Sequence, residues 1–234
     1  MNVVILQPSY IPWRGVFDQI QRADLFIFYD DVQYDKRGWR NRNQIKTPHG
    51  KQWLTIPVHS RGAQTRNIPI HQIRIVWETP WNEEHLKAIQ QFYSKAPYFD
   101  RYQDLLKRFY HRHDEFLADF TIEFTIALAR ELGNTHTRFL RASAIDGITG
   151  QKTDRLIQIL QAVGATHYIS GPSAQGYMEP DKFEEVGITL EYMQYDYPEY
   201  PQLYPPFDSQ VSVLDLLLMT GSEAPNYIFR VSHV

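Results

Sequence analysis

The sequence predicts an α/β fold with a mainly parallel, Rossmann-like central sheet. Residues 3–6 and 25–29 are short apolar runs, the pattern of strands that are buried on both faces. A helix-length segment separates the two runs, which indicates a strand–helix–strand unit. Residues 153–170 then give a helix, a glycine turn and a strand, so we expect the same sheet to resume there.

The composition is that of an ordinary globular protein. Hydrophobic residues make up 43% of the 234 residues and charged residues 22%, which excludes a disordered chain. We found no membrane span and no signal-sequence pattern, so we expect a soluble, cytoplasmic protein without an integral membrane segment. The absence of cysteine excludes disulfides and a thiolate nucleophile. The net charge of -3 argues against nucleic acid as a partner.

The loop between the first two predicted strands is a candidate ligand site. Two prolines within residues 7–15 force the chain to fold a loop there. Because open α/β sheets bind ligands at the carboxyl ends of their strands, Gln7, Tyr10 and Trp13 are candidate binding residues. Asp30 and Asp31 follow the second strand and would lie at the same edge. The alternative is that the aromatic residues cap the core and the aspartates begin a turn.

A strongly basic segment follows. Residues 36–77 contain nine lysines and arginines and no aspartate or glutamate, which should create a positive potential nearby. Guanidinium groups bind carboxylate or phosphate oxygens in two-point contacts, so an anionic small molecule is the expected partner. The alternative is a solvated basic face. The candidate binding residues here are Trp39, Arg40, Arg42, Asn43 and Lys46.

The same segment is predicted to be an antiparallel hairpin inserted into the α/β fold. Its strands are expected at residues 43–46 and 51–58, around a turn at 47–50. A second short pair is expected at residues 67–70 and 73–76. The histidines in this segment lack the fixed spacing of a metal site, so we predict no metal.

A helical section is expected at about residues 80–133. Apolar residues at spacings of three to four predict helices at 81–94, 98–112 and 116–132. His85 lies in the first of them, either as a packed residue or as a proton-transfer group. These helices follow the hairpin insertion within what we expect to be a single domain of residues 1–234.

The last third of the chain should complete the sheet. Strands are expected at residues 137–142, 166–170 and 188–192, with helices at 153–163, 180–186 and 212–219. Ser170 and Gly171 end one of these strands and, with Tyr177, are candidate ligand contacts, although a tight turn explains them equally well. The segment rich in tyrosine and proline around residues 195–207 is expected to cover a cleft or an open edge.

Several sequence blocks together resemble the WbqC-like protein family. They are PSYIPWRG at residues 8–15, DDVQY and RGWRNRNQIK within 30–46, WLTIPV at 53–58, THYISGPSAQGY at 166–177 and VSVLDLLLMTG at 211–221. The resemblance implies a role in bacterial surface-polysaccharide biosynthesis, which includes O-antigen and lipopolysaccharide. It also implies a transferase that passes glycine, another amino acid or an acyl group to a sugar.

This resemblance assigns provisional roles to the candidate residues. A nucleotide-linked sugar carries a diphosphate, which the basic segment would hold, while Trp13, Trp39 or Tyr10 would stack on a base or sugar. Acyl transfer to an amine needs a base and oxyanion donors. Asp31 or His85 would be the base, and Arg42 or Asn43 would stabilise the negative charge.

Two alternatives remain open. The opening loop is similar in order to that of HUP-class nucleotidyltransferases, but Trp13-Arg14-Gly15-Val16 stands where their His-x-Gly-His signature would be, so both histidines are missing. An HUP-like nucleotide-binding fold is still compatible with this order. The second alternative is a non-catalytic module that binds an anion or a sugar. The sequence assigns no cofactor, and it leaves open whether the chain forms a homo-oligomer.

Overall fold

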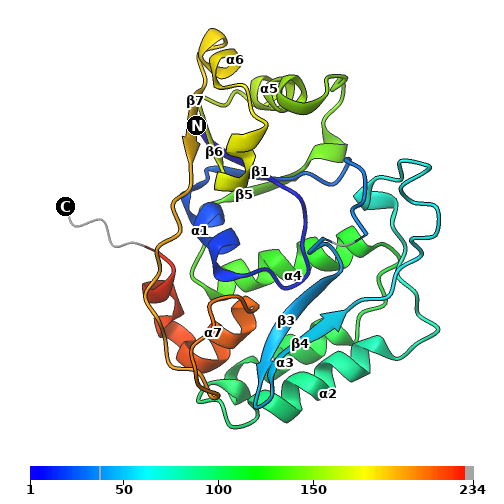
Figure 1. Cartoon of the computed structure of the whole chain (residues 1–234), viewed down its shortest axis with the longest axis vertical. Coiled ribbons are helices and arrows are strands. Elements are labelled where there is room, and N and C mark those ends of the chain that lie inside the picture. The colour runs from blue at the N-terminus through cyan, green and yellow to red at the C-terminus, as the bar shows by residue number, and fades with distance from the viewer. Residues whose placement is uncertain (37, 230–234) are drawn as a thin grey trace.

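The computed structural model describes residues 1–36 and 38–229, and its centre is a parallel five-stranded sheet (Figure 1). The strand order is β5-β2-β1-β6-β7. These strands are β1 (Asn2–Leu6), β2 (Leu25–Phe28), β5 (Arg138–Arg141), β6 (His167–Ser170) and β7 (Thr189–Tyr192). The predicted α/β class and the return of the chain to the first sheet are therefore confirmed.

The central strands are buried on both faces, as their uninterrupted apolar sequences predict. Val3 lies beside Leu25 in the parallel register of β1 and β2. Because side chains alternate along a strand, Val4 faces one side of the sheet and Val3 the other, and both are fully buried.

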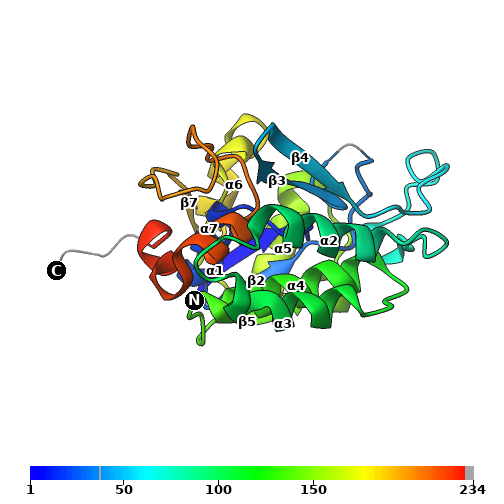
Figure 2. The same cartoon turned by 90° about the horizontal axis from the view of Figure 1, so that it is seen from below.

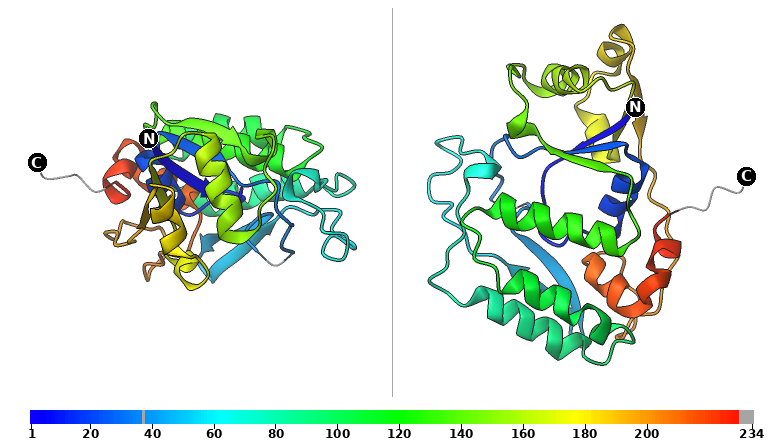
Figure 3. Two further views of the ribbon diagram at one scale, coloured as in Figure 1. Left: turned by 90° about the horizontal axis from the view of Figure 1, so that it is seen from above. Right: turned by 180° about the vertical axis from the view of Figure 1, so that it is seen from behind.

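Helices cover the two faces of the sheet and form two separate apolar cores. On one side, α1 (Arg14–Arg22), α4 (Leu117–Glu131) and α7 (Val213–Thr220) share a core with Val4. On the other side lie α5 (Lys152–Ala162) and α6 (Pro180–Glu185) (Figure 3), which share a second core with Val3. Within the described part of the chain, no helix is long and apolar enough to cross a membrane.

The basic segment does fold as an antiparallel hairpin outside the sheet. Its strands are β3 (Arg42–Thr47) and β4 (Gly50–Thr55), and Gln44 lies opposite Trp53. The turn closes at Gly50, whose φ of 104° favours glycine. The helices α2 (Trp81–Tyr93) and α3 (Phe99–Tyr110) lie beside each other next to the hairpin (Figure 2). The predicted helical section is thus present.

The second strand pair predicted after the hairpin is wrong. Ile70–Gln72 form a short 3-10 helix, and the flanking residues make isolated bridges to other segments. Pro69 bridges to Gln33, and Ile75 bridges to Val58. The two segments therefore satisfy their backbone groups with distant partners and not with each other.

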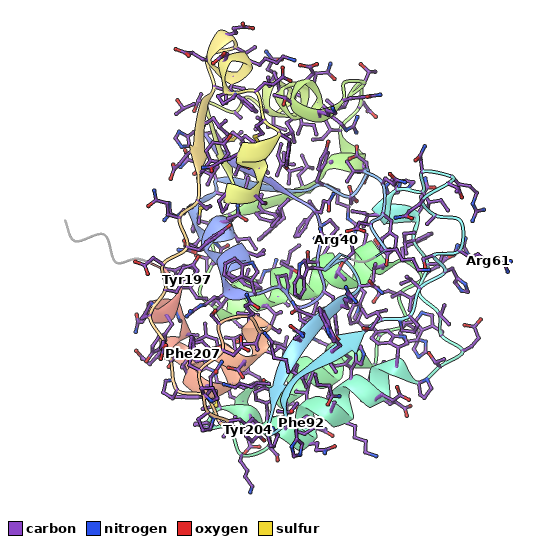
Figure 4. The ribbon with its side chains drawn as sticks, in the orientation of Figure 1. Arg40, Arg61, Phe92, Tyr197, Tyr204 and Phe207 are labelled. Carbon is purple, nitrogen blue, oxygen red and sulfur yellow. The ribbon has the colours of Figure 1, made fainter. Side chains whose placement is uncertain are left out.

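The aromatic and prolyl segment of residues 193–212 runs from β7 to α7 along the surface and is held by side-chain contacts. Nη1 of the buried Arg14 donates to the carbonyl oxygens of Pro198, at 2.8 Å, and Tyr227, at 3.2 Å. Near the middle of the segment, the hydroxyl of Tyr204 donates to the carbonyl oxygen of Phe92 in α2, at 2.7 Å (Figure 4). This segment, called the C-terminal strap below, is therefore held at two places along its length.

Candidate ligand-binding site

A cavity of about 550 Å³ lies at the carboxyl ends of β1 and β6. From β1 the chain continues to β2 on one side of the sheet, whereas β6 pairs with β1 on its other side. The strand order therefore reverses between β1 and β6. Such a switch point is where open α/β sheets bind ligands. The cavity is lined by Leu6, Ser9, Pro12, Trp13, Val16, Gln19, Trp39, Arg40, Asn43, Gly171, Pro172, Ser173, Tyr195, Gln210 and Val211.

Aromatic rings form much of the cavity wall. Trp13, which precedes α1, contacts Tyr195 of the C-terminal strap edge-on, with ring centroids 4.8 Å apart. Gly15 makes room for this indole, because a Cβ atom there would lie 2.3 Å from a carbon of the Trp13 ring. Trp39 comes from the loop before β3 and remains 47% exposed. The wall therefore offers apolar ring surfaces held in defined positions.

Two buried nitrogen donors of the lining lack a partner. Among the residues that the structure describes, Nε of Arg40 and Nε2 of Gln19 make no hydrogen bond. Burial lowers the pKa of Arg40 to about 10, an effect that the nearby charge of Asp35 opposes. Since this pKa is well above neutral, the guanidinium keeps its charge. A buried donor without a partner is unfavourable, so a ligand acceptor at this place would be stabilising.

Asn43 lines the cavity in a different way, because its side chain is already engaged. Its amide nitrogen donates to the carbonyl oxygens of Tyr10, at 3.1 Å, and Ile11, at 2.8 Å. Its side-chain oxygen accepts from the backbone of Gln44. Asn43 thus ties the hairpin to the loop after β1 and holds that loop in place.

The structure brings five of the predicted site residues to the cavity. They are Trp13, Trp39, Arg40, Asn43 and Gly171. Of the others, Gln7 is half-buried directly after β1, Ser170 is buried at the end of β6, and Tyr177 is exposed. These three do not belong to the described lining.

The two predicted aspartates hold the sheet edge to the segments that follow β5. The fully buried Asp30 accepts hydrogen bonds from the backbone nitrogen and the hydroxyl of Ser143, at 3.0 and 2.9 Å. Asp31 forms an ion pair with Arg155 of α5. One oxygen of Asp31, Oδ1, is buried without a hydrogen-bond partner in the described chain. Neither aspartate lines the cavity.

His85 and Tyr10 lie together inside the core. The Tyr10 hydroxyl is 2.8 Å from Nδ1 of His85 and 2.5 Å from the hydroxyl of Tyr110. Burial lowers the pKa of His85 to about 4, which a hydrogen bond to the backbone of Thr55 partly opposes. The imidazole is therefore neutral at pH 7. His85 packs between helices, away from the lining of the cavity.

The basic segment does not converge on the cavity. Of its lysines and arginines that the structure describes, Arg40 alone lines it. The guanidinium of Arg42 lies over the ring of Trp53, 4.4 Å from its centroid. The ammonium of Lys46 bonds to Gln202 and to the carbonyl oxygen of Pro206 in the strap. Several of these cations therefore hold the fold together, and Arg37 lies outside the described residues.

Sequence reasoning missed Gln19 and Gln210 as lining residues. Ser9 and Tyr195 lie in the two segments, residues 7–15 and 195–207, that were expected to form a ligand site and to cover a cleft or an open edge. A signal for Gln19 exists, because it follows Val16 by three residues and so shares a helix face with an apolar residue. No comparable signal marks Gln210, since its position depends on the path of the strap. Within residues 1–36 and 38–229, no three histidine, aspartate or glutamate side chains gather as a metal site would require.

The fold and the cavity define an α/β protein with a ligand-sized site at the switch point of its sheet. The chain belongs to the WbqC-like protein family, whose sequence model matches residues 7–227. It is 40% identical over 230 residues to the uncharacterized protein Rv1507c of Mycobacterium tuberculosis (strain ATCC 25618 / H37Rv), covering 97% of each chain. No solved structure matches the chain. The family resemblance seen in the sequence blocks is thereby confirmed.

Proposed function

We propose that this protein is a transferase that binds a nucleotide-linked amino sugar in the switch-point cavity. It would pass glycine, another amino-acyl group or an acyl group to the sugar, in bacterial surface-polysaccharide biosynthesis such as that of the O-antigen. The observation that carries the proposal is the charged guanidinium of the half-buried Arg40, whose buried Nε is unpartnered beside the aromatic walls of the cavity.

The lining groups match the parts of such a ligand. A diphosphate supplies oxygen acceptors with full negative charge, which the desolvated Arg40 would bind more strongly than an exposed arginine would. The Nε2 donor of Gln19 and the hydroxyls of Ser9 and Ser173 suit the hydroxyls of a sugar. Trp13 offers its ring to an apolar ligand face. The family resemblance adds the surface-polysaccharide setting.

Acyl transfer would form a bond between the sugar nitrogen and the acyl carbon and break the bond between that carbon and its leaving group. The amine must lose a proton, which requires a base. Neither predicted base lines the cavity, and Asp31 is ion-paired with Arg155 of α5. Nδ1 of His85 is already bonded to Tyr10. The proposal therefore assigns the base to neither residue.

Ligand binding is tested by calorimetry with a panel of nucleotide-linked sugars. Arg40→Ala should weaken the binding of the tightest ligand by roughly 10- to 150-fold, the effect expected for one or two lost charge-assisted hydrogen bonds. Arg61→Ala is the matched control, because Arg61 is an exposed arginine of the same basic segment on a distant loop (Figure 4). If no ligand of the panel binds, or if both variants weaken binding equally, the proposal fails.

Turnover separates a transferase from the two alternatives. The protein is incubated with a nucleotide-linked amino sugar and activated donors, namely acyl thioesters and aminoacyl-tRNA, and the sugar is analysed by mass spectrometry. A transferase adds the mass of the acyl group. A binding module gives binding without a product, and nucleotidyl transfer instead releases pyrophosphate from a nucleoside triphosphate.

A further inference from the structure

Two tryptophans stand exposed at the edge of the cavity. Trp39 is 47% exposed and Trp53, on β4, is 42% exposed. Their ring centroids are 5.3 Å apart, and the guanidinium of Arg42 lies over Trp53 at 4.4 Å. Large apolar rings that remain in contact with water commonly mark a place where another molecule binds.

This arrangement also holds Trp39 in one position. Trp53 packs against its indole, and Arg42 packs against Trp53 in turn. The backbone is fixed as well, because the carbonyl oxygen of Trp39 accepts a hydrogen bond from the backbone nitrogen of Tyr10, at 3.1 Å. A ring that is already ordered loses little conformational entropy when a ligand binds to it.

Trp39 and Arg40 are consecutive residues, and both line the cavity. The guanidinium that we propose binds the diphosphate, that of Arg40, is therefore next to the exposed indole of Trp39. Among the other polar lining residues, Gln19 comes from α1 and Ser173 from the segment after β6. Asn43 comes from the hairpin, but its side chain is already bonded to the loop after β1. A nucleotide-linked sugar has the same order of parts, with the base on one side of its diphosphate and the sugar on the other.

We propose that Trp39, supported by Trp53 and Arg42, is the stacking surface for the nucleobase of the ligand. The diphosphate then lies at Arg40, and the sugar points toward Gln19 and Ser173. This inference rests on the proposed function and adds to it the orientation of the ligand. Stacking accepts any base, because every base has an aromatic face, so the choice among bases would depend on other contacts.

The test compares ligands with and without a base. The affinities of wild type and Trp39→Ala are measured by calorimetry for uridine, cytidine, guanosine, adenosine and thymidine diphosphates and for inorganic pyrophosphate. For the tightest nucleoside diphosphate, Trp39→Ala should bind about 5- to 150-fold more weakly. Its affinity for pyrophosphate should change less than about twofold, and Trp39→Phe should retain most of the binding.

Val186→Ala is the control, because Val186 is an exposed apolar residue outside the cavity lining, and it should bind as wild type does. The inference is overturned if Trp39→Ala leaves nucleoside diphosphate binding unchanged, or if it weakens pyrophosphate binding to the same extent. In that case the proposed function still stands, provided that Arg40→Ala weakens binding as predicted above. If wild type binds no nucleoside diphosphate, the proposed function and this inference fail together.

Discussion

At the scale of single residues, burial decides which candidate side chains carry charge. His85 is buried and Arg40 is half-buried, and the consequences differ because their ordinary pKa values differ. Arg40 keeps its proton at neutral pH with a pKa of about 10, whereas His85 loses its proton with a pKa of about 4. The first therefore remains able to bind an anion, and the second acts as a neutral hydrogen-bonding group of the core.

The lowered pKa of His85 predicts a pH dependence of stability. In the unfolded chain a histidine has a pKa of about 6.5, so between about pH 4 and 6.5 the unfolded state binds the extra proton. The stability linked to neutral His85 is present above pH 6.5 and is lost as the pH falls toward 4. From pH 7 to pH 5 this loss should be about 2 kcal/mol.

Urea unfolding at pH 7 and pH 5 measures this loss in wild type and in His85→Gln. The glutamine keeps a hydrogen-bonding group near Tyr10 but does not titrate, so the variant should lose about 2 kcal/mol less than wild type between the two pH values. Equal losses in both proteins would show that His85 is not the group responsible.

Some of the site residues could be predicted from the sequence, and others could not. Trp39 and Arg40 were predicted from the basic segment, because an acid-free run with arginines and an indole suggests anion binding. Arg42 and Lys46 belong to the same run but contact Trp53 and Gln202 instead. Sequence spacing does not reveal this difference, since the direction of each side chain depends on the packing of the hairpin against the strap.

At the scale of elements, Arg14 connects the C-terminal strap to α1. Its guanidinium bonds to the carbonyl oxygens of Pro198 and Tyr227 and lies 4.8 Å from the ring centroid of Tyr197. The hydroxyl of Tyr197 in turn donates to the buried Asp18, at 2.8 Å. The strap contributes Tyr195 to the cavity wall, so these contacts also position the site.

Removing this connection should loosen the strap. Arg14→Ala should lower the free energy of unfolding by about 2–4 kcal/mol, because two carbonyl groups lose a charged donor and the packing on Tyr197 is lost. Chymotrypsin should also cleave more rapidly within residues 193–212. Arg101→Ala, which removes an exposed arginine of α3, should change stability by less than about 0.5 kcal/mol. Unchanged cleavage of the strap in Arg14→Ala would contradict this role.

Most elements could be predicted because their signals are local. The helix expected at 81–94 is α2, at Trp81–Tyr93, and the strand expected at 166–170 is β6, at His167–Ser170. The failed strand pair near Ile70 shows the opposite case. Its backbone bonds to Val32, far back in the sequence, and no local pattern specifies such a distant partner.

At the scale of the whole molecule, one sheet joins two apolar cores. Leu160 of α5 is fully buried in the core that contains Val3, whereas Trp81 is buried in the core that contains Val4. Because Val3 and Val4 are neighbours on the same strand, loss of one core should remove support from the other. We therefore expect the chain to unfold as a single domain.

Leu160→Ala tests this cooperation. The substitution should destabilise the protein by about 2–5 kcal/mol through lost apolar burial and a residual cavity. All five tryptophans lie within residues 13–81, so their fluorescence reports the hairpin side of the molecule, while far-UV circular dichroism reports all helices. Both unfolding midpoints should fall together in urea. A fluorescence midpoint that stays at its wild-type value would show two independent units.

The location of the site follows from the topology, whereas its full lining does not. The expectation that ligands bind at the carboxyl ends of parallel strands led to Trp13 and Gly171, which both line the cavity. The same rule also led to Asp30 and Asp31, which instead hold segments after β5. The rule specifies an edge of the sheet, but the residues on that edge differ in the neighbours that they contact.

The walls of the cavity come from residues 6–19, 39–43, 171–173 and 195–211, which has a consequence for synthesis. During synthesis, the residues of the first three walls, up to residue 173, leave the ribosome before Tyr195 and Gln210 are made. Docking of the strap therefore adds the last wall. A ligand present during synthesis would bind tightly only to finished chains, and so would act on the final step of folding.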